Sequence, residues 1–158
     1  MASEKDLYYA EQAYKTVCST LDSMDWEYQK DEERLMVSFG VRGENIPITV
    51  GIVCNVDLQA LQLISFLPFS VPSHKRAELA SAICAINYRL ALGGFDINLN
   101  DGTVMFKMSS CFRETLIGTE LVSSLIYLTC STVDESNGAL FSLCNGEITL
   151  KDIVEKYS

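Results

Sequence analysis

The sequence predicts an α+β domain in which helices flank a twisted antiparallel sheet of about five to six strands. Two observations support this fold class. Apolar residues recur every three or four positions near the start of the chain and in later segments, which is typical of amphipathic helices. Between these segments apolar and polar residues alternate, which is typical of strands with one buried face. The order of helix, strands, helix, hairpin and helices is that of an α+β fold.

The first half of the chain is predicted to form one helix followed by strands. Over residues 5–24, apolar side chains such as Ala10, Tyr14 and Val17 recur at helical spacing, and charged residues fall between them. After Trp26 the period changes to two. The predicted strands cover 35–41, 46–52 and 56–66, with turns at 30–33 and 42–45, and the alternation slips near 60–63, which indicates a bulge or burial on both faces.

Proline and glycine residues mark the boundaries in the middle of the chain. Pro68 and Pro72 are expected to end the sheet, and Ser73 is expected to cap a second helix that runs through residue 92. The pair Gly93-Gly94 suits the left-handed turn after that helix. This helix is more apolar around its circumference than contact with one sheet face requires, so we expect a second cover, such as another subunit.

The last third of the chain is predicted to contain a hairpin and two helices. Segments 95–99 and 104–108 alternate around Asp101-Gly102, which is the clearest hairpin signal in the sequence. A third helix is predicted over 119–133, and the polar residues 134–138 are expected to end it. Thr149 and Asp152 can form a start resembling a capping box for a short helix over 150–156.

The composition favours a soluble, single-domain protein. No composition break divides the 158 residues, so residues 1–158 are expected to form one domain. The net charge of -9 repels phosphate backbones and anionic lipids, so neither nucleic acid nor a membrane is an expected partner. No signal peptide is visible, and the six widely spaced cysteines are interpreted as buried thiols in a reducing compartment. These observations predict a cytoplasmic protein.

No combination of side chains predicts catalysis, a metal site or a cofactor. His74 is the single histidine, and the sequence places no convincing partner beside it. Asp96, Asn98 and Asn100 have the spacing of calcium ligands, but the last position of such a loop holds Lys107 instead of glutamate. We interpret these residues as the polar face of a hairpin and expect the chain not to be an enzyme.

One polar residue interrupts the apolar stripe of the second predicted helix. Asn87 shares this stripe with Ile83, Cys84 and Ala91, and a buried amide has to find hydrogen-bond partners. We expect its side chain to bond to an exposed backbone edge of the sheet or hairpin. Contact with a ligand is the alternative.

Several segments resemble the YbjN family. They are Phe66–Pro72, Ile86–Leu90, Gly94–Leu99 and Asp101–Val104, and the resemblance extends through the third helix to Leu140–Gly146 and Ile148–Asp152, as in tails of cyanobacterial-type members. This bacterial family has a fold similar to that of type III secretion chaperones. The resemblance therefore implies a twisted antiparallel sheet flanked by helices, frequent dimerisation and a binding or regulatory role, sometimes described as sensory-transduction regulation.

Two hypotheses on function follow from these observations. The first is a non-catalytic, chaperone-like or regulatory module that acts as a homodimer and binds a protein or peptide at a sheet edge or in apolar grooves. Its candidate contact residues are the apolar side chains around the second helix and the hairpin: Phe66, Phe69, Leu90, Phe95 and Phe106. The alternative is a small-molecule sensor or signal-transduction regulator whose pocket lies between helix and sheet and is oriented by Asn87 and Arg89.

Overall fold

Four helices and six strands follow one another in the order that the sequence periodicities predict. They were located in a computed structural model that describes residues 1–158. The elements are α1 (Glu4–Ser23), β1 (Gln29–Asp31), β2 (Met36–Val41), β3 (Ile48–Asn55), β4 (Ala60–Ser70), α2 (Arg76–Arg89), β5 (Gly94–Ile97), β6 (Thr103–Cys111), α3 (Thr119–Cys144) and α4 (Leu150–Tyr157). The strands form a single sheet in the order β1-β2-β3-β4-β6-β5, and every neighbouring pair is antiparallel. The predicted α+β class is confirmed.

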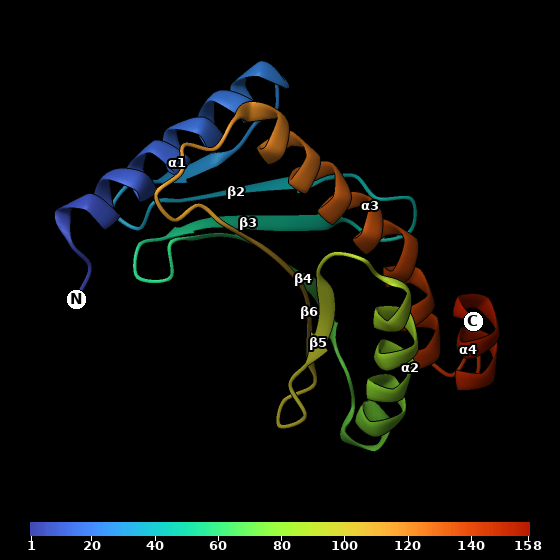
Figure 1. The fold of residues 1–158 in the computed structure, drawn as a ribbon. Helices are drawn as coiled ribbons and strands as arrows, with labels where there is room; N and C mark the ends of the chain where they lie inside the picture. Colours follow the sequence, from blue (N-terminus) through green and yellow to red (C-terminus); the bar gives the residue numbers. More distant parts are fainter.

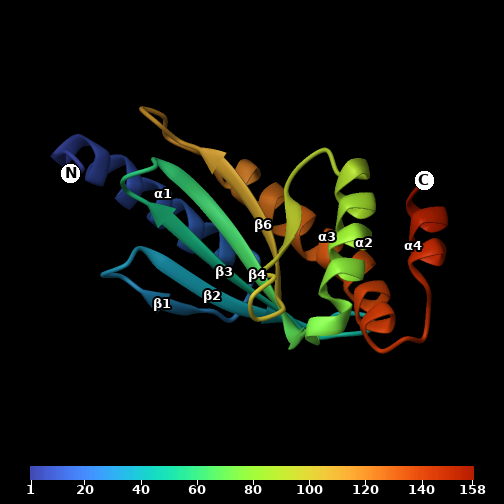
Figure 2. The same ribbon diagram turned by 90° about the horizontal axis from the view of Figure 1, so that it is seen from below.

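The helices cover one face of the sheet and leave the other free. In Figure 1, α1 and α3 lie above strands β2 and β3, and the sheet twists so that β4, β6 and β5 turn away from that direction. Successive strand residues point to opposite faces, and on β3 Ile48, Val50 and Ile52 point toward the helices and are buried. Seen from below, the central strands lie in front of α1 and α3, and no helix covers their near face (Figure 2).

Helix α3 is longer than predicted. The sequence indicates a break at residues 134–138, yet the helix continues to Cys144. The Asp134 side chain accepts a hydrogen bond from the backbone N–H of Glu44 at 2.8 Å, and the Ser136 hydroxyl lies 3.1 Å from that of Tyr157. The polar residues therefore contact other parts of the fold and do not form a loop, so the predicted break is wrong.

Strand β4 also differs from the predicted boundaries. It begins at Ala60, because residues 56–59 form a turn in which Gln59 has a φ of 53°. Burial alternates regularly over 60–65, so the predicted irregularity at 60–63 is not present. The strand runs past Pro68 to Ser70, and its register with β6 shifts between Phe66 and Ser70. A proline is tolerated there because a bulge does not require its missing N–H.

The boundaries and surroundings of α2 correct two further expectations. Residues Ser73–Lys75 form a 3₁₀ turn, α2 begins at Arg76, and no side chain caps its start, so the predicted Ser73 cap is wrong. The helix ends at Arg89 instead of residue 92. A second helix of the same chain, α4, packs beside α2 (Figure 1) and supplies a second cover for it.

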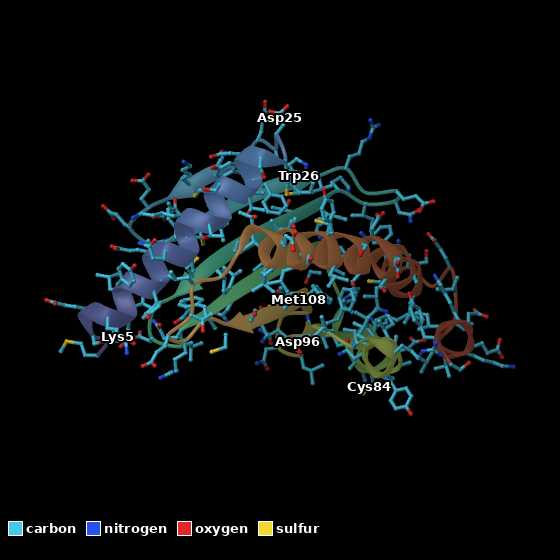
Figure 3. The ribbon with its side chains drawn as sticks, turned by 45° about the horizontal axis from the view of Figure 1, so that its top comes forward. Lys5, Asp25, Trp26, Cys84, Asp96 and Met108 are labelled. Atoms are coloured by element: carbon cyan, nitrogen blue, oxygen red, sulfur yellow. The ribbon has the colours of Figure 1, made fainter.

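The six cysteines differ in their surroundings. All are free thiols; Cys18 and Cys54 are buried, whereas Cys84 and Cys111 are exposed, so the prediction that every cysteine is buried is wrong. Figure 3 shows Cys84 on the side of α2 that faces away from the sheet, and Met108 beneath α3. Burial raises the pKa of the Cys54 thiol to about 12, because the interior disfavours a thiolate. Cys54 is therefore protonated and unreactive at neutral pH.

Candidate functional site

The uncovered face of the sheet carries an apolar centre, and we call this surface the open face. Residues paired across neighbouring strands point to the same side of a sheet. Met36 pairs with Val53 and Phe66 pairs with Met105, and none of the four is buried. The Phe66 side chain is the most prominent of them, with 57% of its surface exposed. Val53 faces Gln62 on β4, but Val53, Ile64 and Phe66 line one hollow together with Met36, so the apolar side chains form a diagonal band over β2, β3, β4 and β6 on the side without helices.

A hollow interrupts this band above β3. Gly51 pairs with Ser38 on one side and with Ile64 on the other. Gly51 has no side chain and Ser38 has a small one, so these two neighbouring positions leave space on the sheet. The larger side chains around them enclose a cavity of about 280 Å³ that we call the Gly51 hollow. It is lined by Met36, Ser38, Thr49, Gly51, Val53, Ile64 and Phe66. An apolar side chain from a partner could enter this space.

Two further hollows on the open face carry negative charge. One of about 510 Å³ lies beside Phe66 and Met105 and includes Asp96 and Asp101, and one of about 460 Å³ near β1 includes Glu27. No lysine or arginine lines either of them or the Gly51 hollow. Hydrogen bonding to Thr103 lowers the pKa of Asp101, so this carboxylate is ionised at neutral pH. Lys107 lies near one of these groups, 3.5 Å from an Asp96 oxygen.

The β5 edge of the sheet is closed by Asn87. The Asn87 Nδ2 group donates to the carbonyl oxygen of Phe95 at 2.9 Å, and the Phe95 N–H donates to Asn87 Oδ1 at 2.9 Å. The prediction that this amide bonds to a backbone edge is confirmed. Because Asn87 occupies both groups of Phe95, a partner strand cannot pair with β5 at that residue. The opposite edge, β1, is only three residues long.

The structure does not bring the five predicted contact residues together. Phe95 and Phe106 are 1% and 0% exposed, with ring centroids 5.1 Å apart, because both point to the helix side of the sheet. Their assignment to a binding groove is therefore wrong, since they are core residues. Phe69 and Leu90 are half-buried against the core, and the Phe69 ring centroid lies 5.2 Å from that of Phe141. Only Phe66 reaches the open face.

Sequence reasoning missed most residues of the Gly51 hollow. One signal was available, because Val53, Ile64 and Phe66 are apolar residues at alternate strand positions that a sheet with one buried face usually fills with polar side chains. Gly51 did not indicate a hollow in the same way, since a glycine in a strand can also mark a bulge, a bend or a close backbone approach. Register between strands was needed to place it beside Ile64.

The protein's own backbone engages both residues that were predicted to orient a pocket. Asn87 is occupied by the β5 backbone, and Arg89 Nη1 donates to the carbonyl oxygen of Ser158 at 2.6 Å. A different cavity of about 700 Å³, the α1 hollow, lies between α1 and the β1–β2 hairpin. It is lined by Glu11, Tyr14, Lys15, Cys18, Ser19, Asp22, Lys30, Glu32 and Leu35. The buried Tyr14 hydroxyl makes no hydrogen bond there, and burial raises the pKa of Tyr14 to about 12.

The structure groups no other side chains into a catalytic or metal-binding site. His74 is exposed at the 3₁₀ turn and makes no hydrogen bond or ion pair. No three side chains of histidine, cysteine, aspartate or glutamate are grouped closely enough to hold a metal ion. None of the four helices combines the length and apolar character that crossing a membrane requires.

Comparisons with known proteins agree with this fold. The sequence model of the YbjN family, described as "Putative bacterial sensory transduction regulator", matches residues 13–142. The chain is similar to the crystal structure of YbjN, "a putative transcription regulator from E. coli", with a TM-score of 0.61 and 10% identity over 84% of this chain and 92% of that chain. It is also similar to a structure of the HopA1-SchA chaperone-effector complex, with a TM-score of 0.48 and 14% identity over 87% of this chain and 93% of that chain. No curated protein matches the sequence.

Proposed function

Because the chain belongs to the YbjN family, we propose that it is a non-catalytic, cytoplasmic protein-binding module with a regulatory or chaperone-like role. The open face is its binding surface. One observation carries the proposal: an apolar band centred on Phe66 crosses four strands on the side that no helix covers. Large apolar patches on soluble proteins mark interaction sites, because burying them against a partner removes apolar surface from water.

Homodimerisation is part of the proposal and is supported by α3. No charged residue lies between Glu120 and Asp134. Leu121 and Leu128, seven residues apart on this helix, are 39% and 41% exposed. A second copy of a chain with net charge -9 meets the least repulsion at an uncharged surface. We assign the contact between copies to this side of α3, away from the open face.

The protein-binding function can be tested with one substitution on the open face. The purified chain, its Phe66→Asp variant and its Leu99→Asp variant are immobilised, and proteins captured from lysate of the source organism are quantified by mass spectrometry. Leu99 is 61% exposed and lies in the β5–β6 turn, so it controls for the added charge. We expect a protein captured in stoichiometric amount by the wild type and the control but not by Phe66→Asp. Capture that is insensitive to Phe66→Asp contradicts the proposed surface.

The alternative, a small-molecule sensor, is supported by one observation at a different place. The Tyr14 hydroxyl is buried beside the α1 hollow with no oxygen or nitrogen partner and only the weakly polar Cys18 thiol near it, and a ligand could supply a stronger partner. A ligand that binds the folded state raises the melting temperature. A metabolite screen by thermal shift should then show a stabilisation that Tyr14→Phe abolishes, and a screen without such a compound contradicts the sensor.

A further inference from the structure

The edges of the sheet disfavour the addition of a partner strand. At β5, both outward backbone groups of Phe95 are bound to Asn87. At β1, a strand of three residues offers few backbone groups for pairing. Strand addition derives its affinity from main-chain hydrogen bonds, so neither edge supplies enough of them. Beyond β5, residues 108–111 of β6 also lack an outer neighbour, but four residues likewise offer few backbone groups. These edges therefore favour a partner segment that binds through side chains on the open face.

The open face favours a helix as that segment. A strand laid across the apolar band would bury N–H and C=O groups that the sheet face cannot satisfy, whereas a helix satisfies these groups internally. From β2 to β6 the band spans three strand spacings, or about 14 Å. A single helix with its side chains has a diameter of about 10–12 Å, so the band is wide enough for one helix.

The charges on the open face select a basic partner. Glu27, Asp96 and Asp101 line its hollows. Lys107, which pairs with Ile64 on the same face, lies 3.5 Å from an Asp96 oxygen, and Glu27 and Asp101 make no ion pair, so the open face keeps an excess of negative charge. The chain as a whole carries a net charge of -9, which disfavours a second copy of itself on this surface. Lysine or arginine beside an apolar stripe would complement both the apolar centre and the carboxylates.

We infer that the open face binds a basic amphipathic helix of a partner protein, with one large apolar side chain of that helix seated in the Gly51 hollow. This inference rests on the proposed protein-binding function and specifies the chemistry of the partner. The helix axis runs along the strands above β2, β3, β4 and β6, and its apolar stripe covers Phe66 and Met105. Its cations lie near the carboxylates of Asp96, Asp101 and Glu27.

Gly51 allows the hollow to be filled without damage to the fold. A Cβ at this position would lie 3.9 Å from the nearest atom, the carbonyl oxygen of Ile64, which is an ordinary contact, and its φ is not in the left-handed region. Gly51→Val should therefore fold at least as well as the wild type, because valine suits a strand better than glycine. Ser109→Val makes a similar change on the same face of β6, outside the three hollows, and serves as the control.

The experiment titrates three fluorescent peptides of about 18 residues with the full chain and follows fluorescence anisotropy. One peptide is a leucine–lysine amphipathic helix, the second replaces lysine by glutamate, and the third alternates valine and lysine as a strand former. We expect the leucine–lysine helix to bind best. Gly51→Val should weaken it at least about tenfold, since an apolar anchor is excluded, and Ser109→Val should leave it unchanged.

Four results would overturn the inference: tighter binding of the strand former, equal binding of the glutamate helix, binding insensitive to Gly51→Val, or binding of no peptide. Dissociation of a homodimer by Gly51→Val, measured by sedimentation, would also overturn it, because the hollow would then hold a second copy. Lysate capture that depends on Phe66 separates this inference from the proposed function. If capture persists while no helix binds, the protein-binding function stands and the helical partner does not.

Discussion

At the scale of single residues, Asn87 shows how one amide can determine the properties of a sheet edge. Its two hydrogen bonds to Phe95 replace those that a seventh strand would make. Exposed strand edges invite pairing with other chains, and proteins commonly protect them. The residue that the sequence marks as a misplaced polar group in an apolar stripe is therefore part of how β5 is held against α2.

We expect Asn87→Ala to lower the free energy of unfolding by about 2 kcal/mol, because the two backbone groups of Phe95 lose their partner. Denaturant unfolding measures the change. Asn100→Ala is the matched control, since this exposed side chain makes no hydrogen bond, and it should change the stability little. Equal stability of Asn87→Ala and the wild type would show that the amide does not hold the edge.

At the scale of secondary structure, two helices begin with the same reciprocal arrangement. Ser3 and Asp6 form a capping box at α1, and Thr149 and Asp152 form one at α4. Hydrogen bonds from each box lower the pKa of the aspartate below its ordinary value of 3.8. The two helices differ in how much they pack against the rest of the protein, because α1 has seven buried residues and α4 has only one, Ile153.

Acid is therefore expected to loosen α4 before α1. A carboxyl group with a lowered pKa in the folded state stabilises that state above its unfolded pKa, and the contribution is lost as pH falls through the folded pKa. Backbone NMR signals of residues 149–157 should shift toward unfolded values as pH falls below about 4, whereas those of α1 persist to lower pH. Asp152→Asn should loosen α4 already at pH 7, and Asp57→Asn, which lies in a turn, should not. An α4 that is unchanged at low pH would contradict this expectation.

The sequence predicted the local features of the elements better than their extents. The capping box at Thr149 and the hairpin at Asp101-Gly102 were predicted because their residues act over a few positions. The continuation of α3 through residues 134–138 was missed, because the Asp134 side chain accepts its hydrogen bond from the backbone N–H of Glu44, ninety residues away. The open face was missed for the same reason, since Gly51 lies beside Ile64 only through strand register.

At the scale of the whole molecule, the two sides differ in composition. The open face combines apolar side chains with carboxylates, whereas the outer side of α3 is uncharged between residues 121 and 133. A protein that binds a partner on one side and a second copy of itself on the other can make both contacts at the same time. The proposed homodimer therefore requires α3, and the open face should be free of it.

We expect the chain to be dimeric at micromolar concentration and Leu128→Lys to weaken the dimer at least about tenfold, because a lysine would be buried without a partner. Sedimentation equilibrium measures both. Leu58→Lys is the control, since Leu58 is 58% exposed in the β3–β4 turn, far from α3 in sequence. A wild-type chain that stays monomeric at 100-fold higher concentration would exclude the α3 contact.

The position of α4 has a consequence for selectivity. It lies beyond the family match, which ends at residue 142, and it packs on α2. A tethered segment competes with free ligands at an effective concentration on the order of millimolar. Any protein that recognises the side of α2 on which α4 packs must first displace α4, so weak ligands are rejected there without a clash or a repulsive charge.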